Sequence, residues 1–447
     1  MKSDTGNLWV AGSSPAGGAT RGKRLSVPRV LDSRYRVICL GLLLCFVRVA
    51  PSLLSSVGAA TSITRGKSMK FFRPMLVCVA AVALVSPVLP ATAGVVESTP
   101  ESPASFNGTV RAVAVKGSTI YVGGSFTRAT DNGATTVRRH LAAVSAVTGE
   151  LLPWNPGANG NVNSLAVFRK RVFVGGSFSK AGGRPVTQLA RISTSTGKAD
   201  KRFRPQIDRE VHAIAVTKKR VYVGGSFREV DGKKRSRLAA LGRTDAALTN
   251  WRPRANRRVE VLRRKGGVVF AGGAFNKING RTDVGHLSAL RLKSGKIAPG
   301  FRGNVSSRVF DLRVTRTRVY AAVGGIGGRV EAIDRSGADL WSRKFDGDVQ
   351  AVTLLDRLIY VGGHFDYLCA TAAVAASNGN CLEGQTFTPK LAALRANGDR
   401  VGWTPQPDSA LGVVTLARAK RKLVVGGDFE HFKGGSVTQP KLALFRK

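Results

Sequence analysis

Short apolar runs separated by polar turns recur along most of this 447-residue chain. The clearest unit is Arg220-Val-Tyr-Val-Gly-Gly-Ser-Phe227, an apolar run typical of a β-strand that contains a glycine pair and ends on an aromatic residue. Similar units stand at residues 120–126, 172–178, 269–275, 319–325, 359–365 and 423–429. Units spaced about 50 residues apart indicate stacked repeats, because one small sheet cannot bury both of its faces alone.

The pattern of apolar and polar residues in each repeat predicts four strands. An apolar strand such as residues 211–216 comes first, and a tight turn leads to the Gly-Gly strand. A polar loop leads to a third strand such as residues 238–241, and a short fourth element carries an aromatic residue followed by Pro or Gly, as in Trp251-Arg-Pro253. We therefore predict an all-β, seven-bladed β-propeller of four-stranded blades over residues 104–447. In the fifth repeat the glycine pair is assigned to Gly324 and Gly325.

Two packing predictions and one closure prediction follow from this pattern. The glycine pairs should allow close approach of neighbouring backbone, and the fourth-element aromatics should pack between blades. The last repeat stops at Lys447 without an aromatic-x-Pro element, whereas Phe106-Asn-Gly108 has that signature and no blade of its own. We therefore expect residues 104–109 to supply the outer strand of the last blade and so to close the ring.

The first 93 residues lie before the repeats, and their sequence indicates a targeting segment. Residues 69–93 combine a basic start, a short apolar core and a small-residue cleavage site, as in a secretory signal peptide. We predict that translation starts at Met69 and that residues 1–68 are a mis-assigned upstream extension; a long, unusual signal extension is the alternative. Residues 94–103 read as a linker. The mature protein is predicted to be secreted, with no transmembrane segment.

The net charge is strongly positive, with 70 Lys and Arg against 27 Asp and Glu, or +43. Basic residues gather in the turn between the first and second strands of five repeats. Since equivalent turns of a propeller lie on one face, they predict a basic face for polyanions. A solvated surface with no ligand is the alternative. The predicted polyanion-binding residues are Arg169, Lys170, Arg171, Lys218, Lys219, Arg220, Arg263, Arg264, Lys265, Arg316, Arg318, Lys420, Arg421 and Lys422.

Cysteines and histidines give few catalytic or metal-binding candidates. Cys369 and Cys381 are the only cysteines after residue 93, and in an oxidising compartment we predict a disulfide between them. The alternatives are a catalytic thiol and a metal pair. Their loop joins the second and third strands, so it should lie on the face opposite the basic turns, where it would be placed to cover the channel. The five histidines are scattered over different repeats, and we predict no metal site, no cofactor and no catalytic residue.

The repeat Val-Tyr-Val-Gly-Gly-x-Phe, then Leu-Ala-Ala-Leu, then Trp-x-Pro resembles the secreted bacterial β-propellers built of delta-60-type repeats. The resemblance implies an extracellular propeller and supplies no catalytic residues. We predict a non-enzymatic binding module for an anionic polymer or cell-envelope surface, without sequence-specific nucleic-acid binding. The alternative is a small-ligand or carbohydrate binder at the channel, or a propeller enzyme such as a quinone-dependent dehydrogenase. The segment from Ala143 to Trp154 resembles the docking motif of that enzyme class with one extra residue.

Overall fold

The computed structural model describes residues 94–447, and the predicted extension (1–68) and signal peptide (69–93) lie outside the described residues. Apart from the 3-10 turn η1 (Lys433–Gly435), the described chain consists of strands and loops, which confirms the predicted all-β class. Within this part of the chain, no helix is long and apolar enough to cross a membrane.

Seven sheets share one plan, in which an innermost strand pairs antiparallel with a second strand and the second pairs with a third. In chain order, the sheets are β2 (Val110–Lys116), β3 (Thr119–Gly124) and β6 (Leu141–Ser145); β7 (Val162–Phe168), β8 (Arg171–Gly176) and β11 (Leu189–Ser193); β12 (Val211–Val216), β13 (Arg220–Gly225) and β16 (Leu238–Gly242); β17 (Val259–Lys265), β18 (Val268–Gly273) and β19 (Leu287–Arg291); β20 (Val309–Val314), β21 (Arg318–Val323), β22 (Arg329–Asp334) and β23 (Asp339–Lys344); β24 (Asp348–Leu355), β25 (Leu358–His364), β28 (Leu391–Leu394) and β29 (Arg400–Val401); and β30 (Val413–Ala419), β31 (Lys422–Gly427) and β34 (Leu442–Phe445).

Further short strands lie within the connections between the second and third strands. They are β4 (Arg128–Asp131) and β5 (Ala134–Val137), joined by β1 (Ser105–Phe106); β9 (Lys180–Ala181) and β10 (Arg184–Pro185); β14 (Glu229–Val230) and β15 (Lys233–Lys234); β26 (Tyr367–Cys369) and β27 (Gln385–Phe387); and β32 (His431–Phe432) and β33 (Val437–Thr438). The predicted fourth strand is regular only in β23 and β29; elsewhere it is reduced to single bridges such as Val144 with Leu151.

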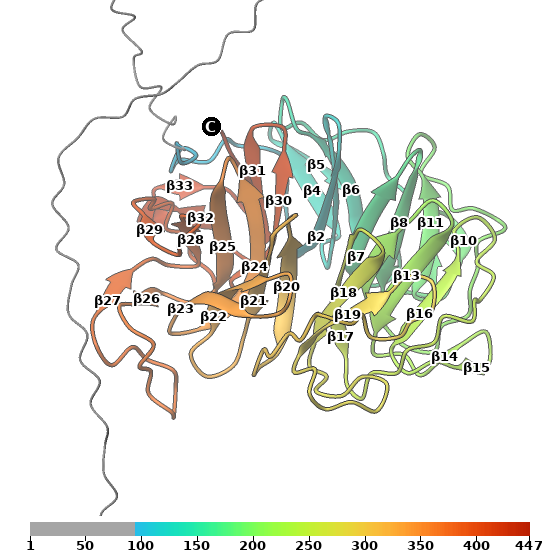
Figure 1. The fold of residues 1–447 in the computed structure, drawn as a ribbon. Helices are drawn as coiled ribbons and strands as arrows, with labels where there is room; N and C mark the ends of the chain where they lie inside the picture. Colours follow the sequence, from blue (N-terminus) through green and yellow to red (C-terminus); the bar gives the residue numbers. More distant parts are fainter. Residues whose placement is uncertain (1–93) are drawn as a thin grey trace, which may run out of the picture. The chain divides into compact units, whose positions relative to one another are not determined.

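The sheets stand side by side around a common axis (Figure 1). Every innermost strand contributes side chains to the cavities along this axis, from β2 through β30. The core consists of buried apolar clusters between adjacent sheets; one such cluster combines Val122 and Val144 with Val424 and Leu444. This radial arrangement is a β-propeller, as predicted. The first sheet lies against the last, as the neighbouring teal and red strands in Figure 1 show.

The glycine pairs allow close packing, as predicted, and the two glycines of a pair do so differently. A Cβ on Gly224 would lie 2.6 Å from Val259 Cγ1 of the following sheet, whereas a Cβ on Gly225 would lie 2.1 Å from the carbonyl oxygen of Glu210 within its own sheet. The first position therefore sets the distance between sheets, and the second admits the start of the innermost strand. Gly426 of the last sheet meets Val110 of the first in the same way, with 2.6 Å to its Cγ1.

The fourth-element tryptophans pack between sheets, as predicted. Trp154 lies edge-on to Tyr121 of its own sheet at 5.0 Å between ring centroids, and its Nε1 donates to Ser193 O of the next sheet at 2.8 Å. Trp251 repeats both contacts with Tyr222 and Arg291 O. In the segment from Ala143 to Trp154, which resembles a quinone-docking motif, Trp154 thus has a structural role between sheets.

The fifth repeat differs from the prediction in register. Val309 pairs with Val323 and Asp311 with Ala322, the positions held by the glycine pair in the other sheets. Gly324 and Gly325 therefore follow β21 instead of forming its glycine pair. In this repeat Trp341, and not Phe345, takes the inter-sheet tryptophan role, because its Nε1 donates to Ala396 O at 2.9 Å.

The N-terminal segment meets the last sheet at a different place from the one predicted. The strand β1 pairs with β4, in the connection between the second and third strands of the first sheet, so residues 104–109 do not form the outer strand of the last sheet. Glu101 instead bridges Leu444 of β34, and Glu97 N donates to Arg446 O at 2.8 Å. Phe106 packs on Phe126 as Phe345 packs on Phe365, so the two aromatic-x-Gly segments are equivalent and each belongs to the sheet that follows it. Residues 94–103, read as a linker, thus include the pairing partners of β34.

Candidate functional site

A β-bulge recurs near the start of every innermost strand. The register shifts by one residue, for example between Val211 and Ala213, so one residue is left out of the ladder. A bulge re-aims the unpaired side chain and bends the strand. The bulge residues are Arg111, Asn163, His212, Glu260, Phe310, Gln350 and Val414.

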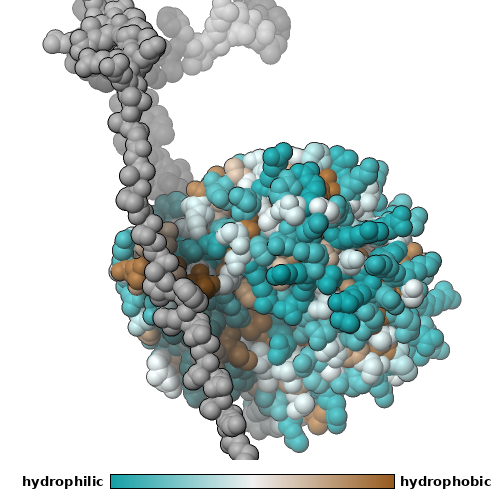
Figure 2. Space-filling model, turned by 90° about the horizontal axis from the view of Figure 1, so that it is seen from below, coloured by the Kyte–Doolittle hydropathy of each residue, from teal (hydrophilic) through white to brown (hydrophobic). Residues whose placement is uncertain are grey.

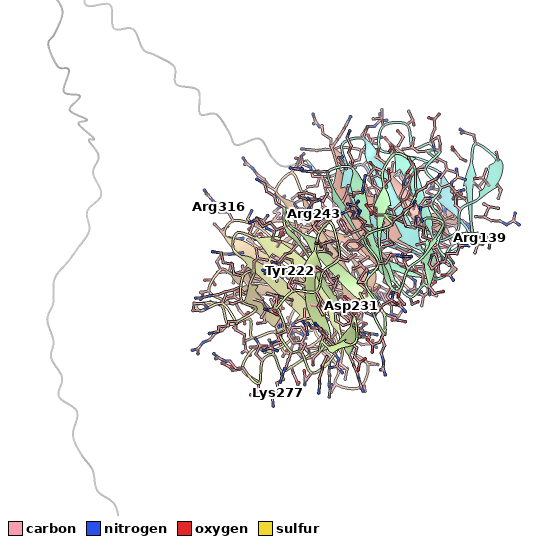
Figure 3. The ribbon with its side chains drawn as sticks, turned by 90° about the vertical axis from the view of Figure 1, so that its right-hand side faces the viewer. Arg139, Tyr222, Asp231, Arg243, Lys277 and Arg316 are labelled. Carbon is pink, nitrogen blue, oxygen red and sulfur yellow. A yellow bond between two sulfur atoms is a disulfide. The ribbon has the colours of Figure 1, made fainter. Side chains whose placement is uncertain are left out.

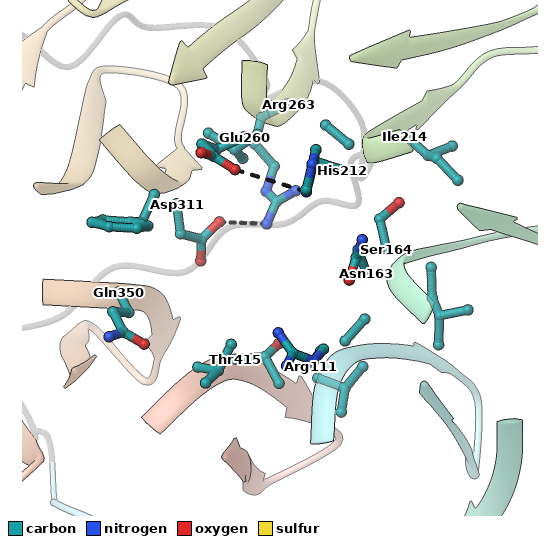
Figure 4. Close-up of a pocket in the computed structure, with 17 residues that line it drawn as sticks. Arg111, Asn163, Ser164, His212, Ile214, Glu260, Arg263, Asp311, Gln350 and Thr415 are labelled. Carbon is teal, nitrogen blue, oxygen red and sulfur yellow. Dashed lines mark hydrogen bonds and ion pairs between the residues drawn. The ribbon is translucent and has the colours of Figure 1, made fainter. Parts of the chain in front are cut away.

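These bulge residues line one mouth of the channel, a cavity of about 420 Å³. We call it the bulge mouth. It opens on the end of the sheets that carries the connections between second and third strands, which we call the loop face; Figure 2 looks onto this end, where hydrophilic residues predominate. The seven residues occupy equivalent positions but differ in chemistry, so they form one ring of five polar and two apolar side chains instead of a repeated site; Figure 4 labels the five polar ones.

Charged groups on one side of the bulge mouth are linked. Glu260 Oε1 accepts hydrogen bonds from Arg258 Nε at 2.6 Å and from Arg308 Nη2 at 2.5 Å. His212 lies 3.9 Å from Glu260 Oε2 through Nδ1 and 3.0 Å from Glu210 Oε2 through Nε2. Burial lowers the pKa of His212, with Arg258 and Arg308 acting in the same direction and the two carboxylates opposing them. His212 is therefore held toward its neutral form.

The other side of the bulge mouth holds Arg111 without a protein acceptor. Arg111 Nε is buried and makes no hydrogen bond within the described residues, and the same is true of Ser164 Oγ one position beyond the Asn163 bulge. Figure 4 shows Arg111 pointing into the channel, across from the His212 and Glu260 pair. Arg111 therefore brings to this side of the ring a positive charge that is unpaired among residues 94–447, whereas the Ser164 hydroxyl is closed off from the cavity.

Arginines line the opposite mouth of the channel, a cavity of about 480 Å³. Arg263 Nη2 pairs with Asp311 Oδ1 at 2.5 Å, and its Nε donates to Leu312 O at 3.0 Å. Burial lowers the pKa of Arg313, and the nearby Arg263 adds to this effect. Arg264 and Arg418 line the same cavity. The channel thus becomes more basic toward this end.

The predicted basic turns lie around this second mouth, because every innermost strand runs from the bulge to the turn. We call this end the turn face. Figure 3 shows Arg316, from such a turn, at the upper edge of the molecule and Lys277, from a loop between second and third strands, at the lower edge. The predicted residues with exposed side chains are Arg169, Lys170, Lys218, Lys219, Arg263, Arg264, Lys265, Arg316, Lys420 and Arg421.

Four predicted turn residues are half-buried at the starts of second strands: Arg171, Arg220, Arg318 and Lys422. Three of them contact the following sheet. Arg220 Nη1 donates to Leu292 O at 3.1 Å, and Arg318 Nη1 donates to Ala396 O at 2.6 Å. Lys422 Nζ donates to Val147 O at 3.0 Å and pairs with Glu101 Oε2 at 2.6 Å. These three side chains already link neighbouring sheets.

Arg263, Arg264 and Lys265 were predicted in a turn but lie within β17, which continues to Lys265; the turn itself is Gly266 and Gly267. The side chain of Arg263 lines the channel, where the guanidinium binds Asp311 and Leu312 O of the following sheet. Arg263 is therefore a channel residue and not part of the turn.

Cys369 and Cys381 form the predicted disulfide, with 5.2 Å between their Cα atoms. Their loop does not line any of the channel cavities described above. It packs instead on the glycine-rich turn of the fifth repeat, where a Cβ on Gly327 would lie 2.7 Å from Val374 Cγ2. The long loop of the sixth repeat thus covers the place where the fifth repeat lacks a loop.

Most other polar candidates stabilise loops. Asn107 Oδ1 accepts the backbone N–H groups of Thr127 and Arg128, and five later residues repeat this capping contact. These five are Asn159, Asp208, Asn256, Asp346 and Asp408. His431 Nδ1 also contacts Asp408, at 2.7 Å. Among residues 94–447, no cluster of three metal-ligating side chains occurs.

Comparisons with known proteins identify no family. No family model matches the chain, and no curated protein matches it in sequence. Among solved structures, the computationally designed Ika8 protein is similar over 79% of this chain and 100% of its own, with 13% identity and a TM-score of 0.46. The WD40 β-propeller domain of Doa1 is similar over 80% of this chain and 98% of its own, with 11% identity and a TM-score of 0.49. These likenesses are too weak to support a conclusion about function.

Proposed function

We propose that this chain is a secreted, non-enzymatic binding protein: a closed seven-bladed propeller of the delta-60-repeat type whose turn face binds an anionic polymer. Closure is supported by the contact of Gly426 with Val110, which repeats the contact between adjacent sheets, and by the pairing of Glu101 with Leu444. Secretion is supported by the signal-like sequence of residues 69–93 and by the Cys369–Cys381 disulfide.

The observation that carries the polymer-binding proposal is the position of the exposed turn cations around the arginine-lined channel mouth. Lys218, Lys219 and Lys420 are exposed at the turns, and Arg264 and Arg418 line the mouth that these turns surround. Like charges held near one another on a rigid ring raise the local positive potential, which attracts an anionic chain and makes binding sensitive to salt. Acidic wall polymers, acidic polysaccharides and extracellular DNA share the chemistry required.

Charge reversal with a matched control tests this proposal. The test variant changes Lys218, Lys219, Arg264 and Lys420 to Glu. The control variant makes the same change at Lys233, Lys234, Arg252 and Arg254, four exposed basic residues that line a separate cavity of about 340 Å³ away from the turns. Both variants change the net charge equally.

Binding is measured by fluorescence anisotropy of a labelled heparin oligosaccharide at about 0.15 M ionic strength, where long-range attraction is largely screened. We expect the turn-face variant to raise Kd about tenfold more than the control, a difference of about 1.4 kcal/mol. Equal losses in both variants would mean that net charge alone causes binding, and the turn-face proposal would fail. Circular dichroism and melting temperature check that both variants fold, since exposed charges seldom change stability.

A further inference from the structure

We propose that the bulge mouth is a separate binding site for a small hydroxylated carboxylate, such as a sugar acid. The site lies at the opposite end of the channel from the turn face, and it does not depend on polymer binding there. Its volume of about 420 Å³ falls within the range of roughly 300–1,000 Å³ typical of small-ligand pockets.

The charge at the bulge mouth favours an anion. Glu260, the carboxylate that lines this cavity, already accepts hydrogen bonds from Arg258 and Arg308. Arg111 adds a further positive charge across the ring and has no carboxylate partner among residues 94–447. A ligand carboxylate would pair with the terminal Nη groups of Arg111, whose planar arrangement matches its geometry, while the buried Nε takes no part.

Neutral polar groups beside Arg111 favour hydroxyls on the same ligand. Asn163 lines the same cavity, whereas the hydroxyl of the next residue, Ser164, is buried against Gly175 and is closed off from it. Gln350, whose Nε2 donates to Leu411 O at 3.3 Å, offers its amide oxygen from the other side of the ring (Figure 4). Hydroxyls can both donate to and accept from such groups, whereas a simple carboxylate would leave them unused.

Apolar groups complete the site. Phe310 and Val414 line the same cavity, and the guanidinium of Arg308 lies over the Phe310 ring at 4.3 Å from its centroid. This stacking leaves the rest of the phenyl ring as an apolar wall for the carbon skeleton of the ligand. One carboxylate, several hydroxyls and a compact carbon ring together match the groups of this mouth.

Titration calorimetry with D-glucuronate tests the proposal, with D-glucose as the neutral ring and acetate as the charge alone. The wild-type chain should bind glucuronate at least about tenfold more tightly than either comparison ligand, because only glucuronate presents both groups. Arg111→Gln should weaken glucuronate binding at least about tenfold, and Asn163→Ala, which removes a side-chain amide from the same cavity, should weaken it a few-fold. Lys277→Gln, which removes one exposed charge on the same face, should leave affinity unchanged.

A second measurement does not depend on a folded variant. In the wild-type protein, glucuronate should shift the imidazole NMR signals of His212, which lines the mouth, and leave those of His431 unchanged. The inference is overturned if glucuronate does not bind, if glucose binds equally well, if Arg111→Gln behaves as Lys277→Gln, or if both histidines shift alike. The turn-face variant should bind glucuronate as the wild-type chain does. The glucuronate result can therefore be interpreted even if the polymer proposal fails.

Discussion

A double-mutant cycle at Gly426 and Val110 tests whether the first and last sheets pack as adjacent sheets do. A Cβ on Gly426 would lie 2.6 Å from Val110 Cγ1 and 2.8 Å from Thr415 Cγ2, so side chains must shift to admit it. Overpacking of this kind typically lowers the free energy of unfolding by about 1–3 kcal/mol. Val110 is fully buried, and Val110→Ala alone should cost on the order of 2 kcal/mol.

The two substitutions should not add. Val110→Ala removes the Cγ1 that the new methyl group would strike, so the double variant should be more stable than the sum predicts by about 1 kcal/mol. The relief is partial because Thr415 stays in place. Urea unfolding followed by tryptophan fluorescence gives the four free energies of unfolding.

The pair Gly272 and Val309 provides the control, since it has the same 2.6 Å contact between sheets that follow each other in the chain. Gly267→Ala, with no atom within 4 Å of its Cβ, should be nearly neutral. Coupling at Gly272 and Val309 combined with additivity within about 0.5 kcal/mol at Gly426 and Val110 would refute the contact between first and last sheets.

Three further predictions concern other parts of the chain. Replacing Cys369 and Cys381 by alanine should lower stability by roughly 3 kcal/mol, measured by thermal melting, and the native protein should show no free thiol at either position. A chain starting at Pro103 should melt at a lower temperature than one starting at Gly94, because Val96 is buried and Trp403 Nε1 donates to Glu97 O at 3.0 Å; equal melting temperatures would contradict this. The pKa of His212 is lowered in the folded protein, so as the pH falls the unfolded chain binds a proton at this histidine before the folded protein does. The stability that neutral His212 provides is therefore present above about pH 6.5 and is lost as the pH falls through its lowered pKa. His212→Gln should flatten the pH dependence of the unfolding free energy below neutrality.

The repeat architecture could be predicted because each repeat carries the same physical signals. The glycine pair and the Leu-Ala-Ala-Leu-like strand have one role each in nearly every sheet, and the tryptophans that are present, such as Trp154 and Trp251, repeat one contact between sheets. Where a repeat departs from the pattern, the same signals mislead. Gly324 and Gly325 match the motif in letters, but strand pairing assigns Ala322 and Val323 to that place.

The channel site could not be predicted because no motif marks it. A bulge residue such as His212 or Arg111 is a single polar residue within an apolar run. Its neighbours in the ring lie about 50 residues away in the sequence. Aligning the repeats on the glycine pair would have placed six of the bulge positions in one column, and only the strand pairing of Ala322 and Val323 adds Phe310 of the fifth repeat. Their shared direction into a channel follows from tertiary structure, as does the burial of Arg220 and Arg318 against the following sheet.

The pairing of Glu101 with β34 has a consequence for the order of folding. Glu101 also pairs with Arg446 Nε at 2.8 Å, and these two residues lie 345 positions apart. During synthesis, the segment around Glu101 leaves the ribosome long before β34 is made. The earlier sheets can therefore stack while the contact between Glu101 and β34 is still unformed. Pairing Glu101 with β34 joins residues that are among the farthest apart in the sequence, and we expect this step to limit the rate at which the native state appears. Until then β34 presents a bare edge, which makes the nearly complete chain the species most exposed to mispairing with other copies.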